Sequence, residues 1–323
     1  MKELREIPWN NQRPNESPGL VALARDVAVV ERPGRGLLRL TGKDPVGMLN
    51  ATLTNSVPKD ARGAYALLLN PKGRVQSDLR VLKSGEDILV DTEPEGADAA
   101  REILGRYAPF SRVKLEDLSN EWSVLGLYGP RAGELLGSPE LAEHQTAEVE
   151  IGGETLLATG VAAPVAGYDL LGPREAVARA GRVLLERGAA PANPDAYETA
   201  RVRAGVPRFG SDLTPENFPG EAGVLDRAVD FGKGCYPGQE TVARMRYRGH
   251  PNKTLYGISY RGETLSPGTP ILQGDKKVGK ITSVAPLPVD GKSLALCYLS
   301  RNTDIGAALT AGNEHIEVLA EVS

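Results

Sequence analysis

The chain has 323 residues, of which 41% are hydrophobic and 25% are charged. This length predicts two or three packed units, and the composition is ordinary for a soluble globular protein. The 38 basic and 42 acidic residues leave a net charge of −4, whereas a protein that holds nucleic acid mainly through its phosphates normally has a basic excess. We therefore expect no direct binding of nucleic acid.

The cysteine and histidine content argues against several kinds of site. Cys235 and Cys297 are too few for a disulfide framework, or for a four-cysteine zinc or iron–sulfur site within one chain. His144, His250 and His315 share no spacing typical of metal ligands, so we expect no metal site. No apolar run reaches the roughly 20 residues that span a bilayer, and the N-terminal segment carries charges of both signs. These features predict a cytoplasmic protein without membrane contact, and the lack of a coiled-coil pattern favours a monomer.

The first half of the chain alternates short apolar runs with turn residues. Residues 8–19 are rich in proline, asparagine and charge and are expected to form an irregular arm. The apolar runs 27–30 and 37–40 flank Pro33-Gly34-Arg35-Gly36, which predicts a β-hairpin. A helix is expected to open here, with Thr41 or Asp44 as its cap and Pro45 in its first turn. The other predicted elements are strands 65–69, 75–81 and 88–91, the first two joined by a turn at 70–73, and a helix over 97–106.

This pattern of strands and helices restarts at residue 122. The predicted elements are strands 122–127, 155–158 and 168–171 and helices 130–136 and 176–187. Two successive sets predict an α+β fold of two packed halves, about 1–120 and 121–245, which together form one domain over 1–245. From Gly249 only short strand candidates remain, at 254–260, 270–273, 277–285, 293–298 and 315–322. Their spacing predicts a small antiparallel β-barrel over 250–323.

The most specific sequence feature is the run Lys233-Gly234-Cys235-Tyr236-Pro237-Gly238-Gln239-Glu240. It places a free thiol in a glycine-lined turn, two residues from a lysine and just before a predicted helix. A cation and a helix N-terminus both favour the thiolate form, which indicates a reactive thiol. The residues alone also fit a small buried side chain in a tight turn.

This run resembles the signature of the YgfZ family, whose usual form is K-G-C-[FY]-x-G-Q-E. Residues 197–210 and 212–217 resemble the arginine-rich helix and glycine turn of the wider superfamily of glycine-cleavage T-proteins, and the similarity extends in order from about Leu37 to Arg248. The resemblance implies tetrahydrofolate or a one-carbon derivative as the ligand. It also implies Cys235 as a catalytic residue that is supported by the other residues of the motif: Lys233, Gly234, Tyr236, Gly238, Gln239 and Glu240.

The resemblance further implies a folate site in the N-terminal domain. In the T-proteins, an aspartate of a G-x-x-x-D-D-L segment approaches the folate nitrogen that accepts the one-carbon unit. The matching run 73–79 keeps the second aspartate as Asp78, a catalytic and folate-binding candidate, and has Ser77 in place of the first. The residues alone leave Asp78 open as an ordinary strand or turn carboxylate.

Two further positions match the folate site. Gly167-Tyr168-Asp169-Leu170 resembles the family pattern G-[YF]-E-[LI], so Asp169 is a candidate for the pterin edge and Tyr168 for contact with the ring. A carboxylate suits the adjacent amine and ring N–H of a pterin, and an arginine suits the anionic glutamate tail. Arg201 lies on the helix that in the T-proteins points an arginine toward folate. The alternatives are a strand with one polar face and solvated helix charges.

Three functions remain open at this point. The first is a tetrahydrofolate-binding accessory protein that uses Cys235 to maintain iron–sulfur enzymes, with those enzymes or their assembly proteins as partners and an indirect effect on tRNA modification. The second is a folate-dependent aminomethyltransferase, which needs the same folate site but no cysteine. The third is RNA binding through Arg244, Arg246, Tyr247 and Arg248, which the net charge disfavours.

Overall fold

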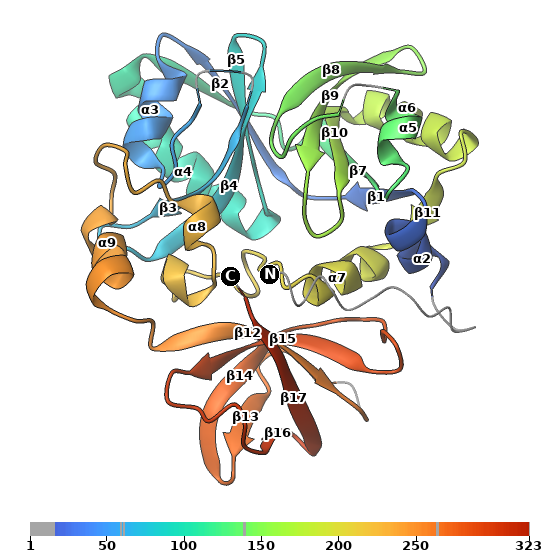
Figure 1. Cartoon of the computed structure of the whole chain (residues 1–323). Helices are drawn as coiled ribbons and strands as arrows, with labels where there is room; N and C mark the ends of the chain where they lie inside the picture. Colours follow the sequence, from blue (N-terminus) through green and yellow to red (C-terminus); the bar gives the residue numbers. More distant parts are fainter. Residues whose placement is uncertain (1–16, 59, 61, 138–139, 263–264, 323) are drawn as a thin grey trace.

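The computed structural model describes residues 17–58, 60, 62–137, 140–262 and 265–322. Two β-sheets with their helices lie side by side, and a closed β-barrel lies beneath them (Figure 1). This architecture confirms the predicted α+β fold with a C-terminal antiparallel barrel. Residues 8–16 of the predicted arm lie outside the described residues, and Pro18–Arg25 forms helix α2.

The first half is built on a five-stranded sheet with the strand order β3-β4-β5-β2-β6. Helices α3 and α4 pack on it through a core that includes Leu40, Leu49 and Leu104. Asp44 caps α3 as predicted, because its carboxylate accepts a hydrogen bond from the Gly47 amide at 2.8 Å. The bounds are β2 Gly36–Gly42, α3 Pro45–Thr52, β3 Ala64–Leu69, β4 Val75–Ser84, β5 Asp87–Thr92, α4 Ala97–Tyr107 and β6 Val113–Asp117.

The second half is built on a six-stranded sheet with the order β11-β1-β7-β10-β9-β8. The predicted amphipathic helix is α6, which buries Val177, Ala180 and Leu184 against this sheet. The bounds are β1 Ala28–Arg32, β7 Trp122–Tyr128, α5 Ala132–Leu136, β8 Thr146–Ile151, β9 Glu154–Val161, β10 Gly167–Pro173, α6 Arg174–Glu186 and β11 Ala190–Ala192.

One predicted hairpin is wrong and another is confirmed. Strand β1 pairs with β7 and β11, whereas β2 pairs with β5 and β6, so the turn at Pro33-Gly34 carries the chain from one sheet to the other. The apolar runs on either side of this turn are buried in different cores, and turn residues do not reveal which strands pair. Strands β3 and β4 do form the second hairpin, with Leu67 opposite Asp78.

The barrel closes in the order β12-β15-β14-β13-β16-β17. Cys297 of β15 is fully buried among its apolar side chains, as an apolar strand predicts, and burial raises the pKa of the thiol. Among the described residues, no helix has the length and apolar character needed to cross a membrane. The bounds are β12 Lys253–Tyr260, β13 Pro270–Gln273, β14 Lys276–Val284, β15 Ser293–Ser300, β16 Leu309–Ala311, which sequence analysis missed, and β17 Glu314–Glu321.

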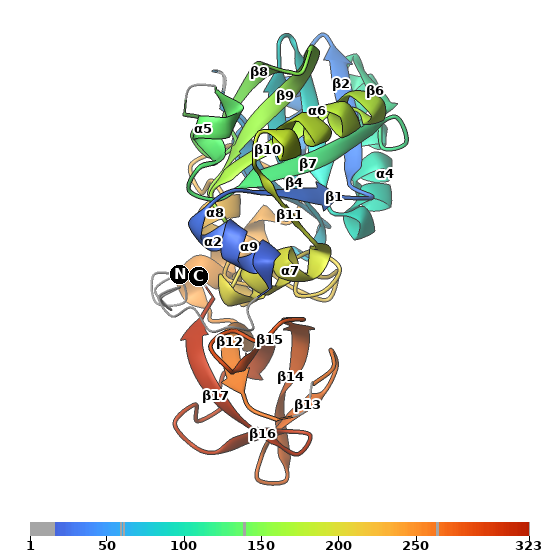
Figure 2. The ribbon, with the colours of Figure 1, turned by 90° about the vertical axis from the view of Figure 1, so that its right-hand side faces the viewer.

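A layer formed by α7, Pro194–Arg203, and neighbouring segments separates the sheets from the barrel, as Figure 2 shows. The fully buried Asp212 fastens this layer to the barrel. Its carboxylate accepts hydrogen bonds from Thr282 at 2.5 Å and Ser283 at 2.8 Å, and it pairs with Arg201 of α7 at 2.7 Å. The Tyr298 hydroxyl donates to the Asp212 carbonyl at 2.8 Å. The barrel is therefore joined to the rest of the protein by polar contacts without access to water.

We expect Asp212→Ala to destabilise the protein by about 3–5 kcal/mol, because it leaves Arg201 without one of its buried partners. Urea denaturation of the purified variant measures this change. The matched control is Asp226→Ala, which removes a surface ion pair with Arg246 and is expected to cost less than about 1 kcal/mol. Equal stabilities of the two variants would contradict the role given to Asp212.

Candidate functional site

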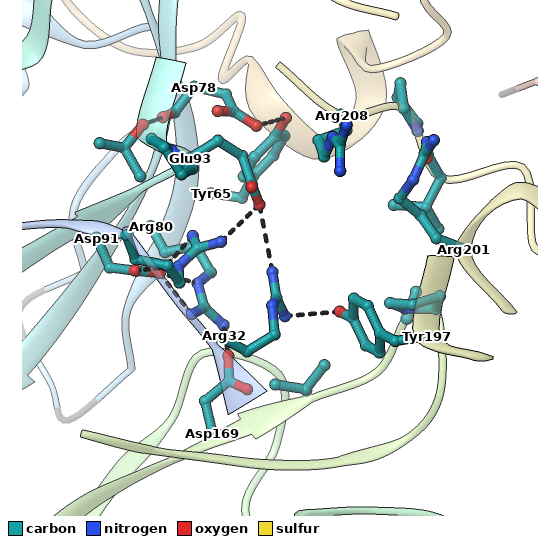
Figure 3. Close-up of a pocket in the computed structure, with 18 of the residues that line it drawn as sticks. Arg32, Tyr65, Asp78, Arg80, Asp91, Glu93, Asp169, Tyr197, Arg201 and Arg208 are labelled. Atoms are coloured by element: carbon teal, nitrogen blue, oxygen red, sulfur yellow. Dashed lines mark hydrogen bonds and ion pairs between the residues drawn. The ribbon is translucent and has the colours of Figure 1, made fainter. Parts of the chain in front are cut away.

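A cavity of about 430 Å³ lies between the two sheets, within the size range of small-molecule sites (Figure 3). One wall comes from β4 and β5 of the first sheet. The opposite wall comes from β10 of the second sheet, and α7 with its following loop completes the site. Polar and ionic side chains from sequence-distant segments therefore converge on one cavity.

Strand geometry determines which side chains of β3 and β4 point toward the cavity. Successive side chains of a strand point to opposite faces, so Asp78 and Arg80 share the face toward the cavity, and Tyr65 lies opposite Arg80 in the ladder. The Tyr65 hydroxyl donates a hydrogen bond to Asp78 Oδ2 at 3.1 Å. Ser77 points the other way, where its hydroxyl lies 2.9 Å from that of Thr92.

A buried ion network crosses the cavity floor. Arg80 Nη1 lies 2.5 Å from Asp169 Oδ2, and Arg80 Nη2 lies 2.5 Å from Asp91 Oδ2. Arg35 binds Asp91 with two nitrogens, at 2.5 and 2.8 Å. Burial by itself raises the pKa of Asp91, but the guanidinium groups of Arg35 and Arg80 outweigh it and hold this pKa at about 2. The network therefore consists of ionised groups.

Glu93 extends the network toward the cavity. Its carboxylate pairs with Arg35 at 2.5 Å and with Arg32 at 3.3 Å, and Arg32 also donates to the Tyr197 hydroxyl at 2.7 Å. Three arginines (Arg32, Arg35 and Arg80) therefore face three carboxylates (Asp91, Glu93 and Asp169).

Asp78 is a further carboxyl group of the cavity that stands outside these ion pairs. It is 7% exposed, and its Oδ1 is buried without a hydrogen-bond partner in the described part of the chain. Burial raises the pKa of Asp78 to about 7, and the charge of Glu93 adds to this effect, whereas Arg35 and the hydrogen bond from Tyr65 oppose it. Near neutral pH this group is therefore able to hold or release a proton within the cavity.

The structure brings three of the predicted folate-site residues together, since Asp78, Asp169 and Arg201 all line the cavity. Asp169 is fully buried, and its oxygens are held by Arg80 and by the Tyr128 hydroxyl. Arg201 is held by Glu198 at 2.6 Å and by Asp212 at 2.7 Å. Asp169 and Arg201 therefore reach the cavity as members of ion pairs rather than as single charges.

The prediction that Tyr168 contacts the ligand ring is wrong for this cavity. Tyr168 neighbours Asp169 on β10, so strand alternation turns it to the opposite face, where it packs in the core of the second half. Tyr197 of α7 is the tyrosine that lines the cavity beside Asp169, and its ring stacks on Tyr128 at 5.3 Å. Tyr197 precedes Arg201 by four residues, and this helical spacing was the available sequence signal. Arg32, Arg35 and Glu93 gave no such signal.

The Cys235 motif lies outside the cavity. Cys235 is exposed and is not among the described residues that line the cavity, so the thiol and Asp78 lie at separate places in the structure. The Lys233 ammonium donates to the carbonyls of Leu53 at 2.6 Å and Asn55 at 3.0 Å. Tyr236 is buried in the core beneath. These contacts hold the thiol on a fixed surface loop.

The end of the motif packs against the turn that leads into β4. Gly238 has a φ of +81°, and a Cβ at this position would lie 2.7 Å from the Asn70 carbonyl oxygen. Glycine alone permits both the backbone conformation and the close approach. Gln239 and Glu240 then begin helix α9, Gln239–Arg248, as predicted. Gly238 thus fixes the hairpin that carries Asp78.

The Asp78 proton has a measurable consequence for stability. Its pKa is raised from 3.8 to about 7 in the folded protein, so the folded state binds this proton more tightly than the unfolded state between these pH values. The contribution is therefore complete below about pH 4 and is lost as the pH rises through 7. We expect the difference in unfolding free energy between wild type and Asp78→Asn to fall by a few kcal/mol over this range, at about 1.4 kcal/mol per pKa unit. A difference that does not change with pH would contradict the assignment.

Comparison with known proteins shows which family this chain resembles. The GCVT N-terminal domain family matches residues 20–233. An aminomethyltransferase of Rubrobacter xylanophilus is 28% identical, covering 84% of this chain and 75% of its own, and one of Thermus thermophilus is 27% identical, covering 88% and 82%. The crystal structure of the glycine cleavage system aminomethyltransferase T from Bartonella henselae has the same fold, with a TM-score of 0.81 and 19% identity over 94% of this chain and 87% of its own. The chain therefore belongs to the GCVT-domain family of the aminomethyltransferase superfamily.

Proposed function

We propose that the cavity binds tetrahydrofolate or a one-carbon derivative, and that the protein transfers a one-carbon unit to or from this ligand. The GCVT-domain family binds tetrahydrofolate and its one-carbon derivatives as substrate. The observation that carries the proposal is Asp78, a buried carboxyl group in the cavity whose Oδ1 has no hydrogen-bond partner. A buried polar atom of this kind is costly unless a ligand satisfies it.

The residues around the cavity fit the parts of a reduced folate. Asp78 Oδ1 is an acceptor for the N–H groups of a pterin. Tyr197 lines the cavity with its ring held by Tyr128 at 5.3 Å and by Arg32 at 4.5 Å, so it offers a fixed aromatic edge to a flat heterocycle. Arg208 lines it as well, is about one-third exposed, and has a buried Nε without a hydrogen-bond partner, which suits the anionic glutamate tail.

The chain's own groups would support one-carbon transfer in three ways. Asp78 holds or releases a proton at its carboxyl oxygens, because its pKa lies near 7. The ion network of Arg35, Arg80 and Asp91 keeps the cavity wall in place and is already fully paired. The two sheets would hold the ligand between them. Bound tetrahydrofolate supplies the nitrogens that carry the one-carbon unit.

We favour an aminomethyl group as the source of the one-carbon unit that tetrahydrofolate receives. The relatives named above are aminomethyltransferases, and the acidic group at Asp78 that such a reaction would use is present. The replacement of the first aspartate by Ser77 does not argue against this reaction, because Ser77 points away from the cavity and bonds to Thr92. The donor would be an aminomethyl group carried on a lipoyl arm. Its carbon would form bonds to the two folate nitrogens as its bonds to nitrogen and sulfur break, which releases ammonia and the reduced lipoyl dithiol.

The proposed folate site predicts that one substitution weakens tetrahydrofolate binding and that another leaves it unchanged. Calorimetric titration of tetrahydrofolate into wild type should give saturable binding, and Asp78→Asn should weaken it about tenfold or more, which corresponds to the loss of one hydrogen bond to a charged group. Cys235→Ser should bind as wild type does, because Cys235 lies outside the cavity. Absence of binding by wild type would contradict the proposal.

The transfer reaction needs its own assay. With an aminomethylated lipoyl carrier protein and tetrahydrofolate, wild type should form methylenetetrahydrofolate, Asp78→Asn should be slower by about 100-fold, and Cys235→Ser should keep its rate. Folate binding without any transfer would reject the aminomethyl donor while leaving the folate site in place.

A second candidate function is the support of iron–sulfur enzymes, directly or through their assembly proteins. The observation that favours it is the exposed Cys235 on a loop that Lys233 and Tyr236 hold in position. Gly234 has open space on its Cβ side, which leaves the thiol approachable. The resemblance of this motif to K-G-C-[FY]-x-G-Q-E supports a role of the YgfZ kind. An effect on tRNA modification would then be indirect.

Complementation separates the two candidates. In cells that lack the gene, the second candidate predicts that Cys235→Ser fails to restore the activity of a tRNA-thiolating iron–sulfur enzyme. Full restoration by Cys235→Ser would show that this function does not need the thiol. Immunoblots showing equal amounts of wild type and variant exclude an effect of poor folding.

A further inference from the structure

His144 joins the two sheets at the edge of the cavity. Its amide donates a hydrogen bond to the Gly160 carbonyl of β9 at 2.9 Å, and its carbonyl accepts one from the Gly63 amide, just before β3, at 2.9 Å. One bond goes to each sheet, so the backbone of this residue is held from both sides. The side chain lines the cavity.

The backbone of His144 is strained. Its φ is +62°, in the left-handed region that costs a non-glycine residue on the order of 1 kcal/mol or more. Within the described ranges, Arg112 and Asp290 are the other non-glycine residues with positive φ, and neither lines the cavity. Strain of this kind persists where the surrounding structure enforces it, and it concentrates at ligand sites.

Among the residues that the structure describes, none forms a hydrogen bond with the imidazole ring. Nδ1 is buried without a partner, and Nε2 lies 3.9 Å from Glu143 Oε1, which is beyond hydrogen-bond distance. Glu143 is instead engaged by Arg227 of α8, Leu225–Ala228, at 2.8 Å. A buried nitrogen without a partner, on a residue that lines a cavity, points to a ligand that supplies one.

Burial, together with the charged groups around the imidazole ring, keeps the ring neutral. Burial lowers the pKa of His144 to about 4, and the positive charges of Arg80 and Arg227 act in the same direction, while Glu143 and Asp91 oppose them. At neutral pH one ring nitrogen therefore donates and the other accepts a hydrogen bond. The nearby Arg80 and Arg227 disfavour a cationic ligand group at this position.

We propose that His144 contacts the ligand directly and helps to select it, by pairing its free imidazole nitrogen with an uncharged N–H or carbonyl group at the edge of a heterocyclic ring. This inference rests on the proposed folate site, and the pterin ring has an edge of this kind. His144 acts beside Asp78 but recognises a different group, because Asp78 supplies an acidic oxygen and His144 a neutral nitrogen.

Three substitutions separate ligand contact from a structural role. His144→Ala removes the ring, and His144→Asn keeps a polar atom on Cγ, where His has Nδ1, and tolerates a positive φ. His144→Gly removes the ring and also relieves the backbone strain. Tetrahydrofolate binding is measured by calorimetry, and stability by thermal unfolding. The exposed His250 provides the control, as His250→Ala.

We expect His144→Ala and His144→Gly to weaken tetrahydrofolate binding by about fivefold or more, the loss of roughly one hydrogen bond, and His144→Asn to stay within about threefold of wild type. His144→Gly should keep or raise the unfolding temperature although it binds less tightly, a combination that a merely structural role would not give. Among the ring signals of the three histidines, those of His144 should shift in an NMR spectrum when tetrahydrofolate is added.

Equal affinities of wild type, His144→Ala and His144→Gly would overturn the role of His144 and leave the folate site intact. Absence of tetrahydrofolate binding by wild type would instead overturn the folate site, and with it this inference. Weaker binding by His144→Ala that is matched by a large loss of stability, and that His144→Gly does not share, would assign His144 a structural role.

Discussion

Arg80 of β4 crosses the space between the sheets and pairs with Asp169 of the opposite sheet at 2.5 Å, while it also pairs with Asp91 beside it at 2.5 Å. All three side chains have little or no access to water, and removing one partner from a buried ion pair typically costs about 3–5 kcal/mol. Arg80 therefore sets the spacing of the two sheets. A cavity of defined width, rather than a closed core, is the result.

The same network determines the chemistry available at Asp78. Burial raises the pKa of Asp78 to about 7, and the charge of Glu93 adds to this effect. Arg35, which is already paired with Asp91 and Glu93, opposes it only in part. The Cys235 motif contributes to this arrangement from outside, since Gly238 packs against the turn at Asn70 that precedes β4. The motif and the cavity are thus connected through the backbone of one hairpin and not through a shared cleft.

The sequence predicted those features that depend on local patterns. The β3–β4 hairpin, the Asp44 cap and the barrel strands followed from turn residues and alternation, and the family resemblance located Asp78. The prediction failed where contacts between distant segments determine the strand pairing. Strands β1 and β2 flank a typical turn, yet they pair in different sheets. Tyr168 was assigned to the ligand although alternation with Asp169 turns it away. His144 was considered only for metal ligation, since nothing local marks a residue held between two sheets.

The most direct test of this account is a crystal structure of the protein with bound 5-formyltetrahydrofolate. We predict that the pteridine ring lies between the two sheets, with one of its N–H groups within hydrogen-bond distance of Asp78 Oδ1 and with the ion pairs of Arg80 unchanged. A ligand bound elsewhere on the surface, for example beside Cys235, or a ring that enters the cavity only after the Arg80–Asp169 pair separates, would contradict it.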